Sequence, residues 1–389
     1  MSTEHLSRLL GRYLGFPPDP VRNIDWQSVM ALAEKNRVLP LVQDVINPSD
    51  DVPVSIQRRL RDEARKSFAA TVLVADNLSD IAGALDGIHW MLLRGPVLGH
   101  MVYKDPLHRP FGDLDVLVAQ EDRAEAARRL NQIGFILPEK AMSIRYYETV
   151  HLHYPLERPG LAGPTRLELH WDIDHPFTLY TIDVEGILQR RVYLTIRGSR
   201  IPVPDSHDLI IMLAIHAAKH AAPLPYWIRE RKTNAIVRTG HLLHFMDLAL
   251  LLNQNAGLVD PDVISARCQS WGTVDALGNC LAAIGLLWPG LGLHPFQITS
   301  QPVHPVKLWL FHRIGSRGFG QLPLLFFRPI RLLDIISYLL PPAEYLRRKT
   351  GKADVLTRVG HTSRGIVRLM QGGLLVLAAR LRHVFGLGS

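Results

Sequence analysis

The chain has 389 residues, 47% of them hydrophobic and 21% charged, and 44 Lys and Arg against 36 Asp and Glu give it a net charge of +8. This composition excludes a disordered or collagen-like chain and predicts a soluble globular protein of two or three domains. The positive charge favours anionic partners, such as nucleotides, nucleic acid or acidic lipid, without choosing among them.

The location of the protein follows from what the sequence lacks. No run of 18 apolar residues appears, and the first residues have no basic stretch followed by an apolar core. Cys268 and Cys280 are too few for a disulfide framework and lack the spacing of metal ligands. We therefore expect a cytoplasmic protein whose cysteines are buried apolar residues in a reducing compartment.

The first 85 residues have a helical pattern. Apolar residues recur at helical spacing after Leu6 and after Trp26, and Asp25 is placed to cap the second of these helices. A longer helix is predicted to follow Pro53 and to continue to Leu85.

The pattern changes at residues 89–93, which form a short apolar run and predict a strand. Arg94-Gly95-Pro96 follows, and proline suits the first position of a helix while glycine relaxes the backbone before it. The resulting strand, turn and helix offer backbone N–H groups to a phosphate.

Residues 113–118 predict a buried strand that carries two acidic residues. Alternation places Asp113 and Asp115 on one face and Leu114 and Val116 on the other. Two adjacent carboxylates resist joint ionisation unless a cation lies between them, and hard oxygen ligands suit Mg²⁺. The alternative is that both aspartates are solvated at the junction of a strand and a loop.

A third carboxylate lies further along the chain. A helix over residues 121–133 ends at Gly134, and residues 135–137 predict another strand. Residues 151–156 and 166–171 alternate as the two strands of a hairpin, so that Glu168 shares a face with Arg166 and His170 and, on the other strand, His151 shares one with His153. Three carboxylates on two strands match the arrangement used for two-metal phosphoryl or nucleotidyl transfer.

The rest of the chain adds helices. Residues 192–204 predict a short pair of extended segments, and helices are expected over 208–222, 239–252, 261–287 and much of 300–389. The predicted fold class is α+β, with a small mixed or antiparallel sheet flanked by helical regions. We divide the chain into an N-terminal helical region (1–85), an α/β core (86–205), a helical domain (206–300) and a C-terminal basic helical region (301–389).

The order of these motifs resembles a known family. Arg94-Gly95, Tyr103, Arg109, the segment Gly112 to Val118, Gly134-Phe135 and Glu168-Leu169-His170-Trp171 together resemble the stand-alone bacterial nucleotidyltransferases of the polymerase-beta-type superfamily. The resemblance spans roughly residues 85–255 and includes His216, Lys219, His220 and Asp247. Two departures weaken the expectation of triphosphate binding: the Gly-Ser of the superfamily is absent, and Arg94 stands where the branch usually has lysine.

The resemblance implies an activity and a set of site residues. The activity is Mg²⁺-dependent transfer of a nucleoside monophosphate from a nucleoside triphosphate to a hydroxyl-bearing acceptor, with release of pyrophosphate. Asp113, Asp115 and Glu168 would be catalytic and would hold two Mg²⁺ ions. The residues implied to bind the nucleotide are Arg94, Gly95, Arg109, Gly112, Lys219 and His220.

Several alternatives stay open at this point. The acceptor can be a small molecule, a peptide or a protein, whereas nucleic acid is disfavoured because no recognition helix or basic strand interleaved with aromatic residues is evident. A catalytically inactive protein of the same fold that binds a peptide or carrier partner is the second hypothesis. The basic C-terminal helix over residues 366–385 either contacts a membrane surface or a partner, or packs on the preceding helices. The segment 315–320 is expected to be a flexible connection.

Overall fold

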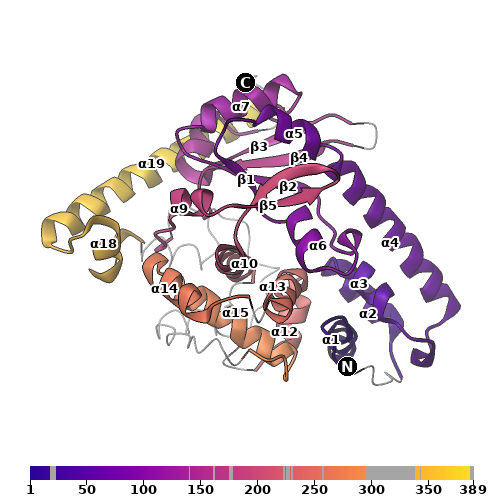
Figure 1. The fold of residues 1–389 in the computed structure, drawn as a ribbon. Coiled ribbons are helices and arrows are strands. Elements are labelled where there is room, and N and C mark those ends of the chain that lie inside the picture. Colours follow the sequence, from indigo (N-terminus) through magenta and orange to yellow (C-terminus); the bar gives the residue numbers. More distant parts are fainter. Residues whose placement is uncertain are drawn as a thin grey trace.

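The computed structural model describes residues 1–17, 23–139, 141–160, 163–174, 178–221, 224, 228, 231–255, 258–293, 338–341 and 343–385. Within them, a four-stranded sheet in the order β1-β2-β4-β3 and a separate hairpin of β5 and β6 are surrounded by helices (Figure 1). The predicted α+β class is confirmed. The strands are β1 (Trp90–Leu92), β2 (Asp113–Val118), β3 (His153–Arg158), β4 (Thr165–His170), β5 (Val192–Ile196) and β6 (Ser199–Val203).

The register of the sheet sets which side chains share a face. β2 runs parallel to β4 with Asp115 opposite Glu168, and β3 runs antiparallel to β4 with His153 opposite His170. Because paired residues on neighbouring strands point to the same side, all four side chains lie on one face.

Two details of the predicted strands are wrong. His151 ends a π-helix, η3 (Tyr147–His151), and Leu152 has a left-handed backbone with φ 59°, so alternation begins only at His153. Residues 135–137 form a single bridge between Ile136 and Glu157 instead of a strand, because Pro138 follows at once and has no N–H to extend the ladder.

The helix predicted from Pro53 to Leu85 is interrupted. It forms α4 (Val54–Ala75) and α5 (Leu78–Ala84), separated at Asn77. The Asn77 amide donates to the carbonyl of Leu73 and to the hydroxyl of Thr165 on β4, both at 3.1 Å, and its oxygen accepts from Arg158 at 3.2 Å. These hydrogen bonds compete with the regular backbone bonds of a helix, and they hold the interruption at Asn77 against β3 and β4.

The helices before α4 and around the sheet are mostly short. Asp25 caps α2 as predicted, accepting from the N–H of Ser28 at 3.2 Å. The elements are α1 (Ser2–Tyr13), α2 (Trp26–Lys35), α3 (Leu39–Val45), the 3₁₀ turns η1 (Pro48–Asp50) and η2 (Pro106–His108), α6 (Pro96–Val102), α7 (Arg123–Gln132), α8 (Ile144–Tyr146) and α9 (Val184–Gln189).

A helical bundle follows the second hairpin. Asp205 caps its first helix by accepting from the N–H of Asp208 at 2.7 Å, and Gly272, with φ 73°, separates the last two helices. The bundle helices are α10 (Ser206–His220), α12 (Thr233–Arg238), α13 (Leu242–Gln254), α14 (Pro261–Trp271) and α15 (Val274–Leu287).

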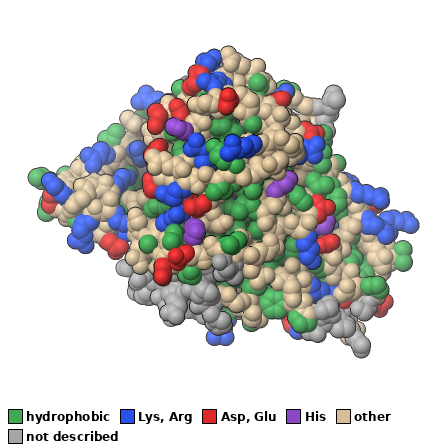
Figure 2. All heavy atoms as spheres, viewed as in Figure 1, with side chains coloured by type: hydrophobic (Ala, Val, Ile, Leu, Met, Phe, Trp, Pro, Cys, Tyr) green, Lys and Arg blue, Asp and Glu red, His purple; other side chains and the backbone are tan. Residues whose placement is uncertain are grey.

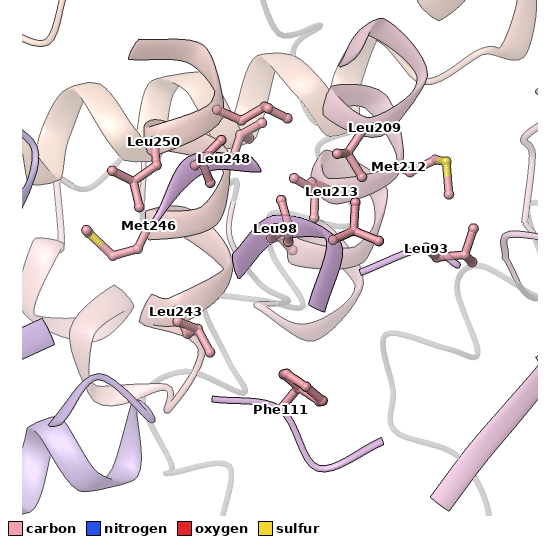
Figure 3. Close-up of a cluster of buried hydrophobic side chains, with 14 of the residues drawn as sticks. Leu93, Leu98, Phe111, Leu209, Met212, Leu213, Leu243, Met246, Leu248 and Leu250 are labelled. Atoms are coloured by element: carbon pink, nitrogen blue, oxygen red, sulfur yellow. The ribbon is translucent and has the colours of Figure 1, made fainter. Parts of the chain in front are cut away.

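Apolar packing joins the bundle to the sheet. Figure 3 shows Leu98 of α6 between Leu213 of α10 and Leu248 of α13, with Leu93 and Phe111 at the edges of the same cluster. This packing fixes the turn at residues 94–96 between the sheet and the bundle. Figure 1 shows α5 and α7 beyond the sheet on the side away from the bundle.

One continuous core runs through these parts. Buried apolar residues from Leu6 to Leu291 form a single cluster, and a smaller one contains Tyr338, Tyr345 and Leu346. Cys268 and Cys280 are free and buried, as predicted. The division of the chain at residues 85, 205 and 300 stays a prediction.

The C-terminal part contains α18 (Ala343–Thr350) and the long α19 (Val355–Phe385), whereas residues 294–337, including 315–320, lie outside the described residues. Figure 2 shows Lys and Arg side chains over α18 and α19 at the left, over the sheet, and over α4 at the right. Within the described ranges, none of the helices combines the length and apolar character needed to cross a bilayer. A contact between α19 and a membrane or partner stays a prediction; its exposed apolar residues are Val355, Leu356, Val359, Ile366, Val367, Met370 and Leu374.

Candidate active site

Three carboxylates meet on the face of the sheet described above. Asp113 and Asp115 come from β2, and Glu168 from β4, where it lies opposite Asp115. Burial, and then the charges of Asp115 and Glu168, raise the pKa of Asp113. None of the other described residues donates a hydrogen bond to the Asp113 carboxylate. The charges of Arg94 and Arg37 offset this repulsion only in part, so the pKa of Asp113 stays raised.

Asp115 is instead held by Arg94. The Nη2 and Nε atoms of Arg94 donate to the two carboxylate oxygens of Asp115 at 2.6 and 3.1 Å, and both side chains are almost buried. Burial alone would raise the pKa of Asp115, but Arg94 and His170 together hold it well below its usual range. The remaining nitrogen, Nη1, donates to Nδ1 of His216 on α10. Arg94 thus joins the carboxylate face to the bundle.

Two histidines accompany Glu168. The Nε2 atom of His170 lies 3.1 Å from an Asp115 oxygen and 3.2 Å from a Glu168 oxygen, while Nε2 of His153 lies 4.0 Å from the other Glu168 oxygen. Burial raises the pKa of Glu168, but the bond to His170 and the charge of His170 lower it by more, so Glu168 is ionised at neutral pH. Burial, and then His170, lower the pKa of His153 to about 4.

Arg109 lies in a buried network with a residue of the bundle. Its Nη2 and Nε atoms donate to Asp247 at 2.8 and 3.2 Å, and the hydroxyl of Tyr103 donates to the same carboxylate at 2.6 Å. Arg109 is 6% exposed and Asp247 is fully buried. The guanidinium of Arg109 therefore holds α13 against the core. A contact between Arg109 and a phosphate stays a prediction.

The two predicted glycines differ in their surroundings. Gly95 has φ 48° and ψ −109°, and a Cβ there would lie 3.3 Å from the ring of Phe111, so the turn before α6 requires glycine. Gly112 is exposed, and nothing lies within 4 Å of where its Cβ would be. Space beside Asp113 is therefore open at Gly112.

Lys219 and His220 lie at the end of α10. Lys219 forms an ion pair with Asp174 at 3.5 Å, beyond the end of β4. The rings of His216 and His220 are 4.5 Å apart, which confirms that they share a helix face. They pack with His241 and His244 from the start of α13, and burial, followed by the charge of Arg94, keeps the pKa of His216 well below its ordinary value.

Sequence reasoning missed Arg37. It follows the fully buried Asn36, whose amide donates to the carbonyl of Val237 at 2.8 Å, and it has a left-handed backbone with φ 59°. Desolvation, and then the charge of Arg109, lower the pKa of Arg37, while Asp113 opposes them. Arg37 is an exposed cation in the turn between α2 and α3, and it acts on Asp113 through its charge, without a hydrogen bond between the two side chains. No pattern in the sequence distinguishes it from a solvated arginine at a helix end.

Comparison with protein families gives a match that extends beyond the sheet on both sides. A family model described as "Uncharacterised nucleotidyltransferase" matches residues 22–289, from before α2 to the end of α15. No curated protein matches the chain. The matched region includes every carboxylate of the site together with Arg37, Arg94 and Asp247. Since the match covers more than half of its length, the chain belongs to this uncharacterised nucleotidyltransferase family.

Proposed function

We propose that this protein transfers a nucleoside monophosphate from a nucleoside triphosphate to a hydroxyl-bearing acceptor and releases pyrophosphate. The observation that carries the proposal is the partly buried face on which Asp113, Asp115 and Glu168 stand together, where the charges of Asp115 and Glu168 disfavour ionisation of Asp113. Membership of a nucleotidyltransferase family supports a nucleotide as the substrate.

The carboxylates fit a divalent cation. Each carboxylate oxygen accepts two bonds. The Oδ1 atom of Asp115 already accepts hydrogen bonds from Arg94 Nη2 and His170 Nε2. Among the described residues, its Oδ2 atom accepts only from Arg94 Nε. Asp113 and one oxygen of Asp115 are therefore available as hard ligands, which suits Mg²⁺.

The residues of the chain would share the chemistry as follows. Asp113 and Asp115 would hold two Mg²⁺ ions, which supply Lewis-acid stabilisation of the charge on the phosphates. The acceptor oxygen would attack the α-phosphorus as the bond to the pyrophosphate oxygen breaks. Glu168 would complete one metal site or accept the proton of the attacking hydroxyl. We propose contacts to the phosphates from Arg94, Arg109, Lys219, His220 and the backbone at Gly95 and Gly112; of these two glycines, only Gly112 is exposed.

The test is release of pyrophosphate. We expect the purified protein with Mg²⁺, one of the four nucleoside triphosphates and a panel of hydroxyl acceptors (small molecules, peptides and proteins) to release pyrophosphate and label one acceptor class. Release without any acceptor would indicate hydrolysis or self-modification, and mass spectrometry of the protein distinguishes these two. No release with any member of the panel would favour the inactive, partner-binding alternative.

Arg37 provides a second prediction. Its charge acts on Asp113, which makes Arg37 a candidate contact for the outer phosphates, and a hydrogen bond to a charged group contributes about 1.5–3 kcal/mol. We expect Arg37→Gln to raise the KM for the nucleoside triphosphate at least about 10-fold, the equivalent of about 1.4 kcal/mol, with a smaller change in kcat. Arg61→Ala, at an exposed position of α4, is the matched control. An unchanged KM in Arg37→Gln would remove Arg37 from the site.

A further inference from the structure

The two histidines beside Glu168 suggest a metal ion different from Mg²⁺. We propose that His153, Glu168 and His170 bind a divalent transition-metal ion of the zinc class at the edge of the carboxylate face. The inference deepens the proposed function, on which it rests for its catalytic role, because it assigns Glu168 to a metal ligand set.

The three side chains lie close enough together to share one ion. One ligand atom from each of the three side chains lies within 4.8 Å of the other two. Two nitrogen or oxygen ligands at about 2.0–2.1 Å from a tetrahedral zinc ion are about 3.3 Å apart. Nε2 of His170 lies 3.2 Å from one oxygen of Glu168, in a hydrogen bond that the ion would replace, and Nε2 of His153 lies 4.0 Å from the other oxygen, so modest side-chain shifts would bring the three ligands onto one ion.

The surroundings of His153 indicate which of its ring nitrogens faces Glu168 with a lone pair. Its Nδ1 lies 3.2 Å from the backbone carbonyl of His151, which can only accept a hydrogen bond, so we assign the ring hydrogen to Nδ1. In the neutral ring the lone pair is then on Nε2, which faces the Glu168 carboxylate. Two acceptors face each other there, and a cation between them resolves the conflict. A backbone carbonyl that receives the second ring N–H is the usual support of a metal-binding histidine.

The chemistry and the placement of the three ligands suit a transition-metal ion. Two imidazoles with a carboxylate favour zinc, iron or copper, whereas Mg²⁺ prefers oxygen ligands. The ligands stand on two adjacent strands in fixed register, with His153 opposite His170, so the set is rigid. Glu168 is 34% exposed, so an ion can enter from solvent.

The experiment uses the full chain freed of metal by a chelator and needs neither nucleotide nor acceptor. Zn²⁺ is titrated by calorimetry, and zinc X-ray absorption reports the ligands. We expect one tight site with two imidazole ligands, which millimolar Mg²⁺ does not displace. His153→Ala and His170→Gln should each lower the Zn²⁺ affinity at least about 10-fold, and His89→Ala, an exposed histidine before β1, should leave it unchanged.

The result that overturns the proposal is an unchanged Zn²⁺ affinity in His153→Ala or a zinc shell of oxygen ligands alone. His153 is partly exposed at the start of β3, so its replacement is expected to leave the far-ultraviolet circular dichroism spectrum unchanged. The outcome is independent of catalysis. Histidine-dependent Zn²⁺ binding without pyrophosphate release would contradict only the proposed function, and Mg²⁺-supported release without such binding would contradict only this site.

Discussion

Replacing Asp247 by alanine should lower the free energy of unfolding by about 3–5 kcal/mol, because it leaves the Arg109 guanidinium buried without its partner. Arg109 and Asp247 connect the loop before β2 to α13 across the core. Tyr103 loses its acceptor in the same variant. The measurement is the shift of the urea midpoint at constant m value.

Two further variants separate charge from hydrogen bonding in this network. Tyr103→Phe removes one bond to Asp247 and should cost about 1 kcal/mol. The double variant Arg109→Met with Asp247→Leu should recover much of the loss, because a buried ion pair is replaced by apolar contacts of similar volume. A cost below about 1 kcal/mol for Asp247→Ala would mean that Arg109 is not confined to this pair.

The largest effect on activity is expected for Asp113→Asn. Removing one charged metal ligand should lower kcat by roughly 10³-fold, or about 4 kcal/mol. Stability should not fall. The pKa of Asp113 is raised in the folded state. Its ionisation therefore lowers the free energy of unfolding as the pH rises from the unfolded-state pKa through the folded-state pKa. The neutral amide in Asp113→Asn does not ionise, so the variant avoids this loss at pH 7.

Asp115→Asn makes a useful contrast with Asp113→Asn. It should also abolish transfer, but it breaks the pair with Arg94 and leaves that guanidinium buried, so we expect it to be destabilised. Asp62→Asn makes the same replacement at an exposed position of α4, outside the site, and should leave activity unchanged. Full activity in Asp113→Asn would remove the carboxylate face from the mechanism.

The sequence predicted the parts of the site that depend on local periodicity. Alternation in residues 113–118 correctly separated the aspartates from Leu114 and Val116, and the hairpin correctly placed Glu168 with His170. The parallel pairing of β2 with β4, which brings Glu168 opposite Asp115, links residues about 50 positions apart and has no local signal. The three carboxylates were expected to converge because the set suits two-metal chemistry, but the parallel direction of this pairing was not predicted.

Partners across the core were beyond the reach of sequence patterns. The pairing of Arg94 with Asp115, and of Arg109 with Asp247, depends on how the turn before α6 and helix α13 pack, which periodicity does not specify. Both arginines were expected to face phosphates. Arg37 was missed for the same reason, since its neighbours come from distant segments. The break at Asn77 was missed because its contact with Thr165 forms only in the folded chain.

The missing Gly-Ser of the superfamily favours the inactive alternative, and the carboxylates favour catalysis. A protein that only binds a partner has no physical need for Asp113, whose charge is disfavoured by burial and by two neighbouring carboxylates. Thermal stability measured with increasing Mg²⁺ and nucleoside triphosphate separates the two hypotheses, since only a catalyst requires the ion and nucleotide to stabilise the protein jointly.

The central claim is that Asp113 and Asp115 hold a divalent cation beside a triphosphate. Mn²⁺ can stand in for Mg²⁺, and its anomalous scattering in crystals grown with a non-hydrolysable nucleoside triphosphate locates the ion directly. We expect a manganese peak within about 2.5 Å of an oxygen of each aspartate and in contact with the phosphates. A nucleotide bound elsewhere, or a peak that touches neither aspartate, would contradict it.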